Sequence, residues 1–189
     1  MSVKPSFFER AGRRPFVWLV CAGLAGGGLT GCLSPSFLKS CEGSEALVEE
    51  VASLRIFDAA PAGATALRGF EEVESECVAD SGDAWVAADR VYTYPGTQAQ
   101  VLRHYRTVAE RDGWELVPED PSLAATTGRD VGLCFTRGGH GDMKVLDVFF
   151  PTAEYFEYGG LTPPGPEFDS GAGYVVTVSS EVDGDVQGC

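Results

Sequence analysis

The sequence predicts an α+β domain, in which an antiparallel sheet carries one long and one shorter helix packed on one face. Two observations predict this class. Strand-like segments come before and after a single long helical pattern, instead of alternating with helices. Turn residues also separate neighbouring strand-like segments at hairpin distances, over residues 80–83 and 138–142. The pattern leaves the order of the strands open.

The first expected element is the shorter helix, over residues 44–57, with Ser44 as its N-cap. Apolar side chains fall on one face of this segment at helical spacing: Leu47, Val51 and Leu54. Residues 59–69 follow and contain Pro61 and Gly63. Both residue types interrupt regular structure, so this stretch is expected to be a loop.

Two strands are expected next, over residues 70–78 and 84–94. The cluster Asp80-Ser81-Gly82-Asp83 lies between them and has the residues that hairpin turns prefer. Pro95 and Gly96 end the second strand. The two segments therefore predict a β-hairpin.

A capping box predicts the start of the long helix. Thr97 caps the first turn and the Gln100 side chain reaches back to it. An apolar stripe then recurs at helical spacing: Val101, Leu102, Tyr105, Val108 and Ala109. Gly113 supplies a left-handed C-terminal cap, and Trp114 is expected to fold back onto the last turn.

Three further strands are predicted, over residues 131–137, 143–150 and 174–182. The first two are joined by the glycine-rich loop 138–142, which predicts a second hairpin. Both faces of the segment 143–150 are largely apolar. This strand is therefore expected to lie centrally in the sheet.

The N-terminal stretch has the composition of an export signal. Four basic residues precede an apolar run over residues 16–29: Lys4, Arg10, Arg13 and Arg14. The alternative is a membrane-spanning helix, which needs about 20 apolar residues. The run is shorter and broken by glycines, which favours a cleaved signal peptide.

The run ends in Leu29-Thr30-Gly31-Cys32, which resembles the lipobox of bacterial lipoproteins. The resemblance implies that Cys32 receives a diacylglyceryl thioether and that the chain is cut immediately before it. A plain signal peptidase site with an incidental Cys32 is the alternative. Several buried acyl chains would hold the protein firmly at the membrane without a spanning segment.

The lipobox resemblance divides the chain into a signal peptide over residues 1–31, a tether over 32–43 and the α+β domain over 44–189. It implies a location at the extracytoplasmic face of the cell membrane, with the lipid as the membrane contact. Residues 32–189 are about one domain's worth of chain.

A second export motif overlaps the basic region. Arg13-Arg14, followed by Phe16 and Val17, resembles the twin-arginine export signal. Gly12 departs from that pattern, as does the Trp that follows Val17. The alternative is that the two arginines simply supply positive charge, so the export route stays open.

The cysteines fit an exported protein. Cys21 leaves with the signal peptide and Cys32 is the lipid site, which leaves an even number in the domain: Cys41, Cys77, Cys134 and Cys189. Such a set predicts two disulfides, with three connectivities open. We predict Cys77–Cys134, because both lie in expected strands, and Cys41–Cys189, because chain ends often lie close together. Zinc binding is disfavoured, because the chain has no Cys-x-x-Cys pair and only two histidines.

A run of features from Cys77 onward resembles uncharacterised lipoproteins of actinobacteria. They are Cys77 with Asp80-Ser81-Gly82, a tyrosine-containing strand, His104-Tyr105-Arg106 on the helix, Gly113-Trp114, and Cys134-Phe135. The resemblance supports the fold and the location, and it implies no assigned activity.

The charge of the chain limits its partners. The formal net charge is −14 at pH 7, and removal of the basic signal peptide makes the remaining chain more acidic. Such a surface repels phosphate backbones, so we expect no nucleic-acid partner. It suits cationic partners, although solubility alone is a sufficient reason for it.

No catalytic or metal pattern stands out. His104 on the long helix and His140 in the glycine loop are the candidate bases for a hydrolase, but no nucleophile motif accompanies them. The glycines of 138–141 lack the ending of a phosphate-binding loop. The acidic turns 80–83 and 183–185 do not continue into a calcium-binding loop. We therefore expect no enzyme activity, metal or cofactor.

The long segment over residues 151–173 is the candidate recognition loop. It holds four aromatic residues among prolines and glycines: Tyr155, Phe156, Tyr158 and Phe168. Loops of this length in compact domains are usually functional or disordered, and aromatic anchors dominate interface energetics. The alternative, which we favour, is that these rings fold onto the domain's own core.

These observations together predict a membrane-anchored envelope lipoprotein that acts as a binding module for an envelope component or protein. An inhibitor of a cationic secreted enzyme is the alternative, and a hydrolase using His104 or His140 is less favoured.

Overall fold

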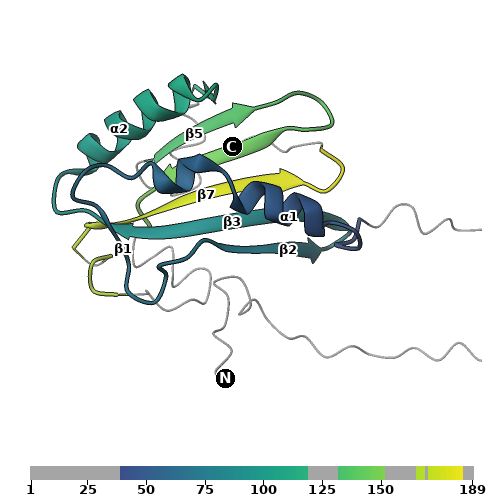
Figure 1. Ribbon diagram of the computed structural model, residues 1–189, viewed down its shortest axis with the longest axis horizontal. Coiled ribbons are helices and arrows are strands. Elements are labelled where there is room, and N and C mark those ends of the chain that lie inside the picture. Colours follow the sequence, from purple (N-terminus) through teal and green to yellow (C-terminus); the bar gives the residue numbers. More distant parts are fainter. Residues whose placement is uncertain (1–38, 119–131, 152–164, 169, 185–189) are drawn as a thin grey trace, which may run out of the picture.

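The computed structural model describes residues 39–118, 132–151, 165–168 and 170–184. Ten elements lie along these ranges (Figure 1): α1 Glu45–Ala52, the 3₁₀ helix η2 Arg55–Asp58, β1 Thr65–Ala66, β2 Glu74–Asp80, β3 Asp83–Thr93, α2 Gln98–Arg111, β4 Glu115–Leu116, β5 Gly132–Arg137, β6 Lys144–Phe149 and β7 Gly173–Glu181. Within these ranges, no helix combines the length and the apolar character that crossing a bilayer requires.

All strands belong to one antiparallel, seven-stranded sheet. The order is β1-β3-β7-β6-β5-β4, and β2 also pairs with β3. The predicted α+β class is therefore confirmed. β6 lies between β5 and β7, as its two apolar faces indicated. β7, which comes last along the chain, lies between β3 and β6 and joins the two hairpins into one sheet.

The helices cover one face of this sheet (Figure 1), and the main core lies beneath them. Strand alternation sends every second side chain of β3 and β7 into this core, including Val86, Tyr92, Tyr174 and Val176. Tyr92 stacks on Tyr174 with ring centroids 5.3 Å apart. The Tyr92 hydroxyl donates a hydrogen bond to the Phe57 carbonyl, which fixes η2 to the sheet.

The first helix is shorter than predicted. α1 ends at Ala52, Leu54 is extended, and η2 then buries Ile56 and Phe57. Ser44 occupies the N-cap position, but its hydroxyl makes no capping bond to the helix. It donates instead to the Cys41 carbonyl at 2.8 Å, in the turn that enters the helix.

The long helix follows its prediction. Both hydrogen bonds of the capping box between Thr97 and Gln100 are present. Gly113 has φ +84°, the left-handed value that glycine adopts at low cost. The Trp114 amide donates to Ala109, and its ring is buried, with Arg137 stacked 4.3 Å from the ring centroid. The short strand β4 that follows was not predicted.

The first hairpin is tighter than its four turn residues suggested. β2 and β3 pair as far as Asp80 opposite Asp83, so only Ser81 and Gly82 form the turn. Both have positive φ, +53° and +99°, as a type I′ turn requires. At the turn, both strands therefore extend further than predicted, but β2 begins only at Glu74, four residues after its predicted start at residue 70.

The end of the predicted tether is part of the domain. The Lys39 amide donates to the Gly82 carbonyl at 2.9 Å. The Lys39 ammonium lies 3.1 Å from Asp183, 3.3 Å from Glu181 and 3.6 Å from Asp83. The chain is therefore attached to the sheet from Lys39 onward, inside the range that was expected to be tether.

The predicted disulfide pairing is wrong. Cys41 is bonded to Cys77, with their Cα atoms 5.7 Å apart. Cys134 is also disulfide-bonded. Cys189 lies outside the described residues. A Cys77–Cys134 bond is excluded because three strands separate β2 from β5, a distance of about 19 Å. The two side chains also project from opposite faces of the sheet.

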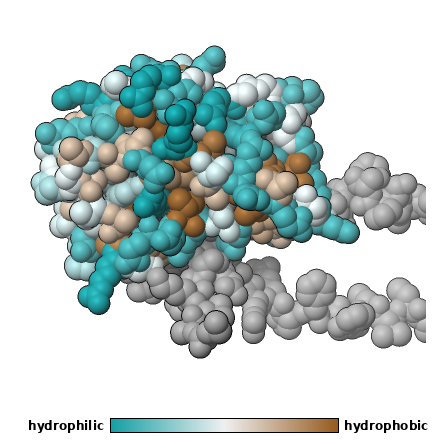
Figure 2. Space-filling view, in the orientation of Figure 1, coloured by the Kyte–Doolittle hydropathy of each residue, from teal (hydrophilic) through white to brown (hydrophobic). Residues whose placement is uncertain are grey.

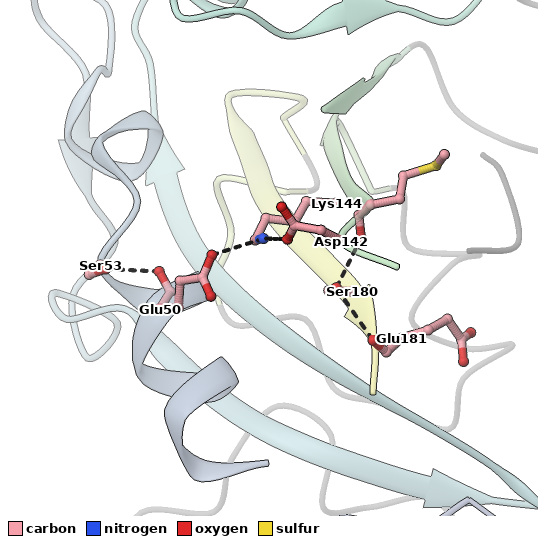
Figure 3. A network of polar contacts seen from close by, with 7 residues as sticks. Glu50, Ser53, Asp142, Lys144, Ser180 and Glu181 are labelled. Carbon is pink, nitrogen blue, oxygen red and sulfur yellow. Dashed lines mark hydrogen bonds and ion pairs between the residues drawn. The ribbon is translucent and has the colours of Figure 1, made fainter. Parts of the chain in front are cut away.

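A buried lysine attaches α1 to the sheet (Figure 3). The Lys144 side chain on β6 is only 5% exposed, and its ammonium lies 2.9 Å from Glu50 on α1 and 2.6 Å from Asp142. Burial lowers the pKa of Lys144, but the hydrogen bonds to the two carboxylates outweigh it and the net shift is upward. Beside it, the Ser180 hydroxyl donates to the Met143 carbonyl at 2.9 Å. The two contacts join α1, β6 and β7.

Candidate functional site on the far face of the sheet

The face that bears the helices is mainly hydrophilic, with its hydrophobic residues in small separate groups (Figure 2). Such a surface is typical of a monomeric protein and does not by itself indicate a binding site. The opposite face of the sheet, which we call the far face, differs in chemistry. Its side chains are those that alternate with the main core along each strand.

A polar row crosses the far face at right angles to the strands. Glu74 of β2 pairs with Asp89 of β3, Asp89 with Thr177 of β7, Thr177 with Asp147 of β6, and Asp147 with Cys134 of β5. Directly paired side chains lie within reach of one another. The register therefore gathers three carboxylates from distant parts of the chain into one line.

Asp89 is the most unusual member of this row, because it is only 6% exposed. The Thr177 hydroxyl donates to its Oδ1 at 2.5 Å. Its second oxygen, Oδ2, is buried with no hydrogen-bond partner, and so is Oε2 of the half-buried Glu74. A buried carboxylate oxygen without a donor costs free energy. Asp89 and Glu74 therefore each have a buried acceptor oxygen without a hydrogen-bond donor.

The ionisation of Asp89 reflects this setting. Burial raises its pKa to about 7, against 3.8 for an ordinary aspartate. The hydrogen bond from Thr177 opposes the shift, while the charges of Glu74 and Glu76 add to it. The described residues that shift the pKa of Asp89 are therefore two acids, Glu74 and Glu76, and Thr177 through its hydroxyl group. Asp89 changes charge near neutral pH.

A small hollow lies beside the two carboxylates. It is lined by Phe70, Glu72, Glu74, Asp89, Val91 and Val175, and its volume is about 10 Å³. That is close to the smallest volume that holds one water molecule, about 10–15 Å³. The hollow admits a water-sized group and is too small for an organic substrate.

An apolar cluster adjoins the hollow at one end of the far face. It comprises Leu67, Val91, Phe168 and Val175, with Phe70 and Phe149 packed against it. Phe168 was a candidate for the recognition loop, but it is 3% exposed and its ring packs in this cluster. For this residue, the expectation that the ring folds onto the domain's own core is confirmed.

Most other predicted site residues lie outside the described residues. These are Arg13 and Arg14, the lipobox residues Leu29, Thr30, Gly31 and Cys32, and the loop aromatics Tyr155, Phe156 and Tyr158. Of the two histidines, His104 hydrogen-bonds the Ala59 carbonyl through Nε2 at 2.5 Å and meets the edge of Tyr105. His140 is exposed in the loop between β5 and β6.

Metal-binding groups of three or more His, Cys, Asp or Glu side chains do not occur within the described part of the chain. The two acidic turns are engaged in the fold. In one, Ser81 donates to Asp80 at 3.0 Å within the β2–β3 turn. In the other, Asp183 pairs with Lys39.

Asp89 and Glu74 were not among the predicted site residues, although one signal was present. Asp89 is a charged residue at a buried position of an otherwise largely apolar strand, Ala84 to Tyr92. A charge at such a position is rarely buried without a partner or a task. The contact of Asp89 with Thr177, 88 residues later, could not be predicted from any local sequence pattern.

Asp89 can exchange a proton near neutral pH, and the accessible surface of the adjoining hollow is almost entirely apolar. In comparisons with known proteins, no family model, no curated protein and no solved structure matches the chain significantly. No relative therefore assigns a role to these residues.

Proposed function

We propose that the protein is a lipid-anchored module of the cell envelope that binds a partner on the outer side of the cytoplasmic membrane. One observation carries the location: a disulfide-bonded domain follows directly after a lipobox-like sequence. Cys41, bonded to Cys77, lies nine residues after Cys32. Disulfides persist in oxidising compartments outside the cytoplasm.

Binding is favoured over catalysis by what the candidate bases do. His104 is hydrogen-bonded to a backbone carbonyl and braces α2 against the segment after η2. A general base needs a nucleophile within hydrogen-bond reach. The His104 ring is instead engaged by a backbone carbonyl and the edge of Tyr105, which favours a packing role for it.

The anchor is tested by metabolic labelling of cells with an alkyne fatty acid. The wild-type protein is expected to carry the label and to sediment with membranes. Cys32→Ser is expected to lose the label, because the thioether has no sulfur to form on. Cys21→Ser is the matched control and is expected to label like the wild type, since Cys21 lies in the segment that is removed.

Equal labelling of the wild type and Cys32→Ser would reject the anchor. Absence of label from the wild type, with the protein found in the culture medium, would support the plain signal peptidase site instead.

A further inference from the structure

We propose that Glu74 and Asp89 form a pH-sensitive contact between β2 and β3, and that loss of the Asp89 proton releases residues 74–76 from β3. Such a change within the fold is independent of the proposed lipid anchor.

Two carboxyl groups are placed opposite each other at the start of β2. Glu74 and Asp89 are directly paired residues, and each has a buried oxygen for which the described residues supply no hydrogen bond. A protonated Asp89 has an O–H group to donate, and the paired side chain of Glu74 lies within its reach. An ionised Asp89 has no donor and sets a like charge opposite Glu74, which destabilises the strand pair.

The groups around Asp89 favour its neutral form. Burial raises its pKa to about 7, and the charges of Glu74 and Glu76 on β2 add to the rise. Thr177 of β7 donates a hydrogen bond to Asp89, which opposes the shift. The next residue of the polar row, Asp147 of β6, is a further acid. Of the described groups that shift this pKa none is basic, so they do not neutralise a charge on Asp89.

The first three residues of β2 have little packing to hold them on β3. They are Glu74, Ser75 and Glu76, so no apolar side chain attaches them to the sheet. The hollow of about 10 Å³ lies between this segment and the sheet, since Glu72 and Glu74 line it together with Asp89. Among the described strands, β2 pairs with β3 alone. Segments with few buried apolar contacts open locally before the rest of a fold.

Fixed points on both sides confine the opening. Before the segment, Val73 packs against the main core. The Arg90 guanidinium, on the opposite face of β3 from Asp89, donates to the Glu71 carbonyl at 3.0 Å. After the segment, Cys77 is held by its disulfide. The opening is therefore limited to the three residues between these contacts.

The population of the open state is expected to increase as pH rises. In the closed fold Asp89 ionises near pH 7, whereas in contact with water it ionises near its ordinary value of 3.8. Between these values opening releases a proton, so the opening constant rises about tenfold per pH unit and levels off above pH 7. The open state exposes the edge of β3 from Ala87 to Asp89.

The test is amide hydrogen exchange, followed by NMR on the purified full chain in a non-ionic detergent between pH 5 and 8. The rates are corrected for the intrinsic pH dependence of exchange. The amides of residues 74–76 report on the opening, and those of α2 report on the rest of the fold. We expect the protection of residues 74–76 to fall roughly tenfold or more between pH 5 and 8 and to stay below that of α2.

Matched variants assign the effect to the carboxyl pair. The amide of Asp89→Asn cannot ionise, keeps an acceptor for Thr177 and presents an N–H donor to Glu74. Residues 74–76 of this variant are expected to keep at pH 8 the protection that the wild type has at pH 5. Glu74→Gln gives an ionised Asp89 a donor and is expected to lose most of the pH response. Glu115→Gln removes a charge from β4, at the other end of the sheet order, and is expected to behave like the wild type.

Equal protection of residues 74–76 at pH 5 and 8 in the wild type would overturn the proposal. So would protection equal to that of α2 at pH 8, because β2 would then open only with the whole fold. A wild-type pH response in Asp89→Asn would also overturn it. If that variant does not fold, the same response in Glu74→Gln decides. Because exchange is measured on purified protein, its result is independent of fatty-acid labelling.

Discussion

At the scale of single residues, Asp89 shows how burial changes the chemistry of a side chain. Its carboxyl group is almost fully enclosed, accepts one hydrogen bond from Thr177 and has Glu74 as its directly paired neighbour on β2. Burial without a cation disfavours the charged form. In the fold, Asp89 therefore keeps its proton up to about pH 7.

The raised pKa of Asp89 predicts that stability falls as pH rises. In the unfolded chain the group ionises near pH 3.8 and in the fold near pH 7, so between these values the folded state holds a proton that unfolding releases. The stabilisation is fully present below the unfolded pKa and is lost as pH rises through 7, a change of about 4 kcal/mol in the free energy of unfolding. Urea unfolding between pH 3.5 and 8 measures it.

Asp89→Asn is expected to remove this part of the pH dependence. The acids that face Asp89 are Glu74 and Glu76 on β2 and Glu72 at the hollow, and they remain in the variant. Glu115→Gln is the control and should retain the wild-type slope. A wild-type slope in Asp89→Asn would contradict the assignment.

At the scale of elements, α1 depends on tertiary contacts for its position. It is only eight residues long, and short helices are marginal in water by themselves. The Cys41–Cys77 bond lies just before its start, and Lys144 reaches Glu50 on its surface. By contrast, α2 has fourteen residues, a full capping box and a buried face of its own.

The carboxylates of Glu50 and Asp142 are expected to stabilise the fold only while the Lys144 ammonium is present. Glu50→Ala with Asp142→Ala leaves a buried ammonium without its two carboxylates, which should cost about 2–3 kcal/mol. Lys144→Met keeps the stem and removes the charge, and in that background the same two changes should cost little. Urea unfolding followed by circular dichroism measures the four combinations. Glu49→Ala, a change of a neighbouring acid on α1, is the control.

The difference between the two backgrounds decides this prediction. If the two alanine changes lower the free energy of unfolding equally in the wild type and in the Lys144→Met variant, the lysine makes no net ion-pair contribution.

At the scale of the whole molecule, the sheet order explains the connectivity of the chain. β7 inserts between β3 and β6, so the hairpins β2–β3 and β5–β6 lie on opposite sides of it. The disulfide between Cys41 and Cys77 then ties the start of the domain to β2, which among the described strands pairs with β3 alone. Edge strands have fewer partners than central ones, so a covalent tie is most useful there.

Removal of this disulfide is expected to cost about 4 kcal/mol in the chain-entropy model, since it closes a loop with a sequence separation of 36 residues. Cys41→Ser with Cys77→Ser, compared with the wild type by thermal unfolding, tests the magnitude. Peptide mapping without reduction should recover Cys41 linked to Cys77. A peptide linking Cys77 to Cys134 would contradict the structure.

The amino-acid sequence alone was enough for the parts of the fold that depend on neighbours along the chain. The Thr97–Gln100 capping box, the left-handed Gly113 and the Ser81-Gly82 turn act over a few residues, so their chemistry is visible in the sequence. The two apolar faces of β6 likewise predicted its central place.

Which distant residues meet was settled by the tertiary structure. The pairing of Cys41 with Cys77, and the row that joins Glu74, Asp89 and Thr177, both follow from the order and register of strands. Those depend on the packing of a whole sheet, to which each local segment contributes only a small part of the free energy. The carboxylates of the far face therefore come together only when the strands are placed side by side.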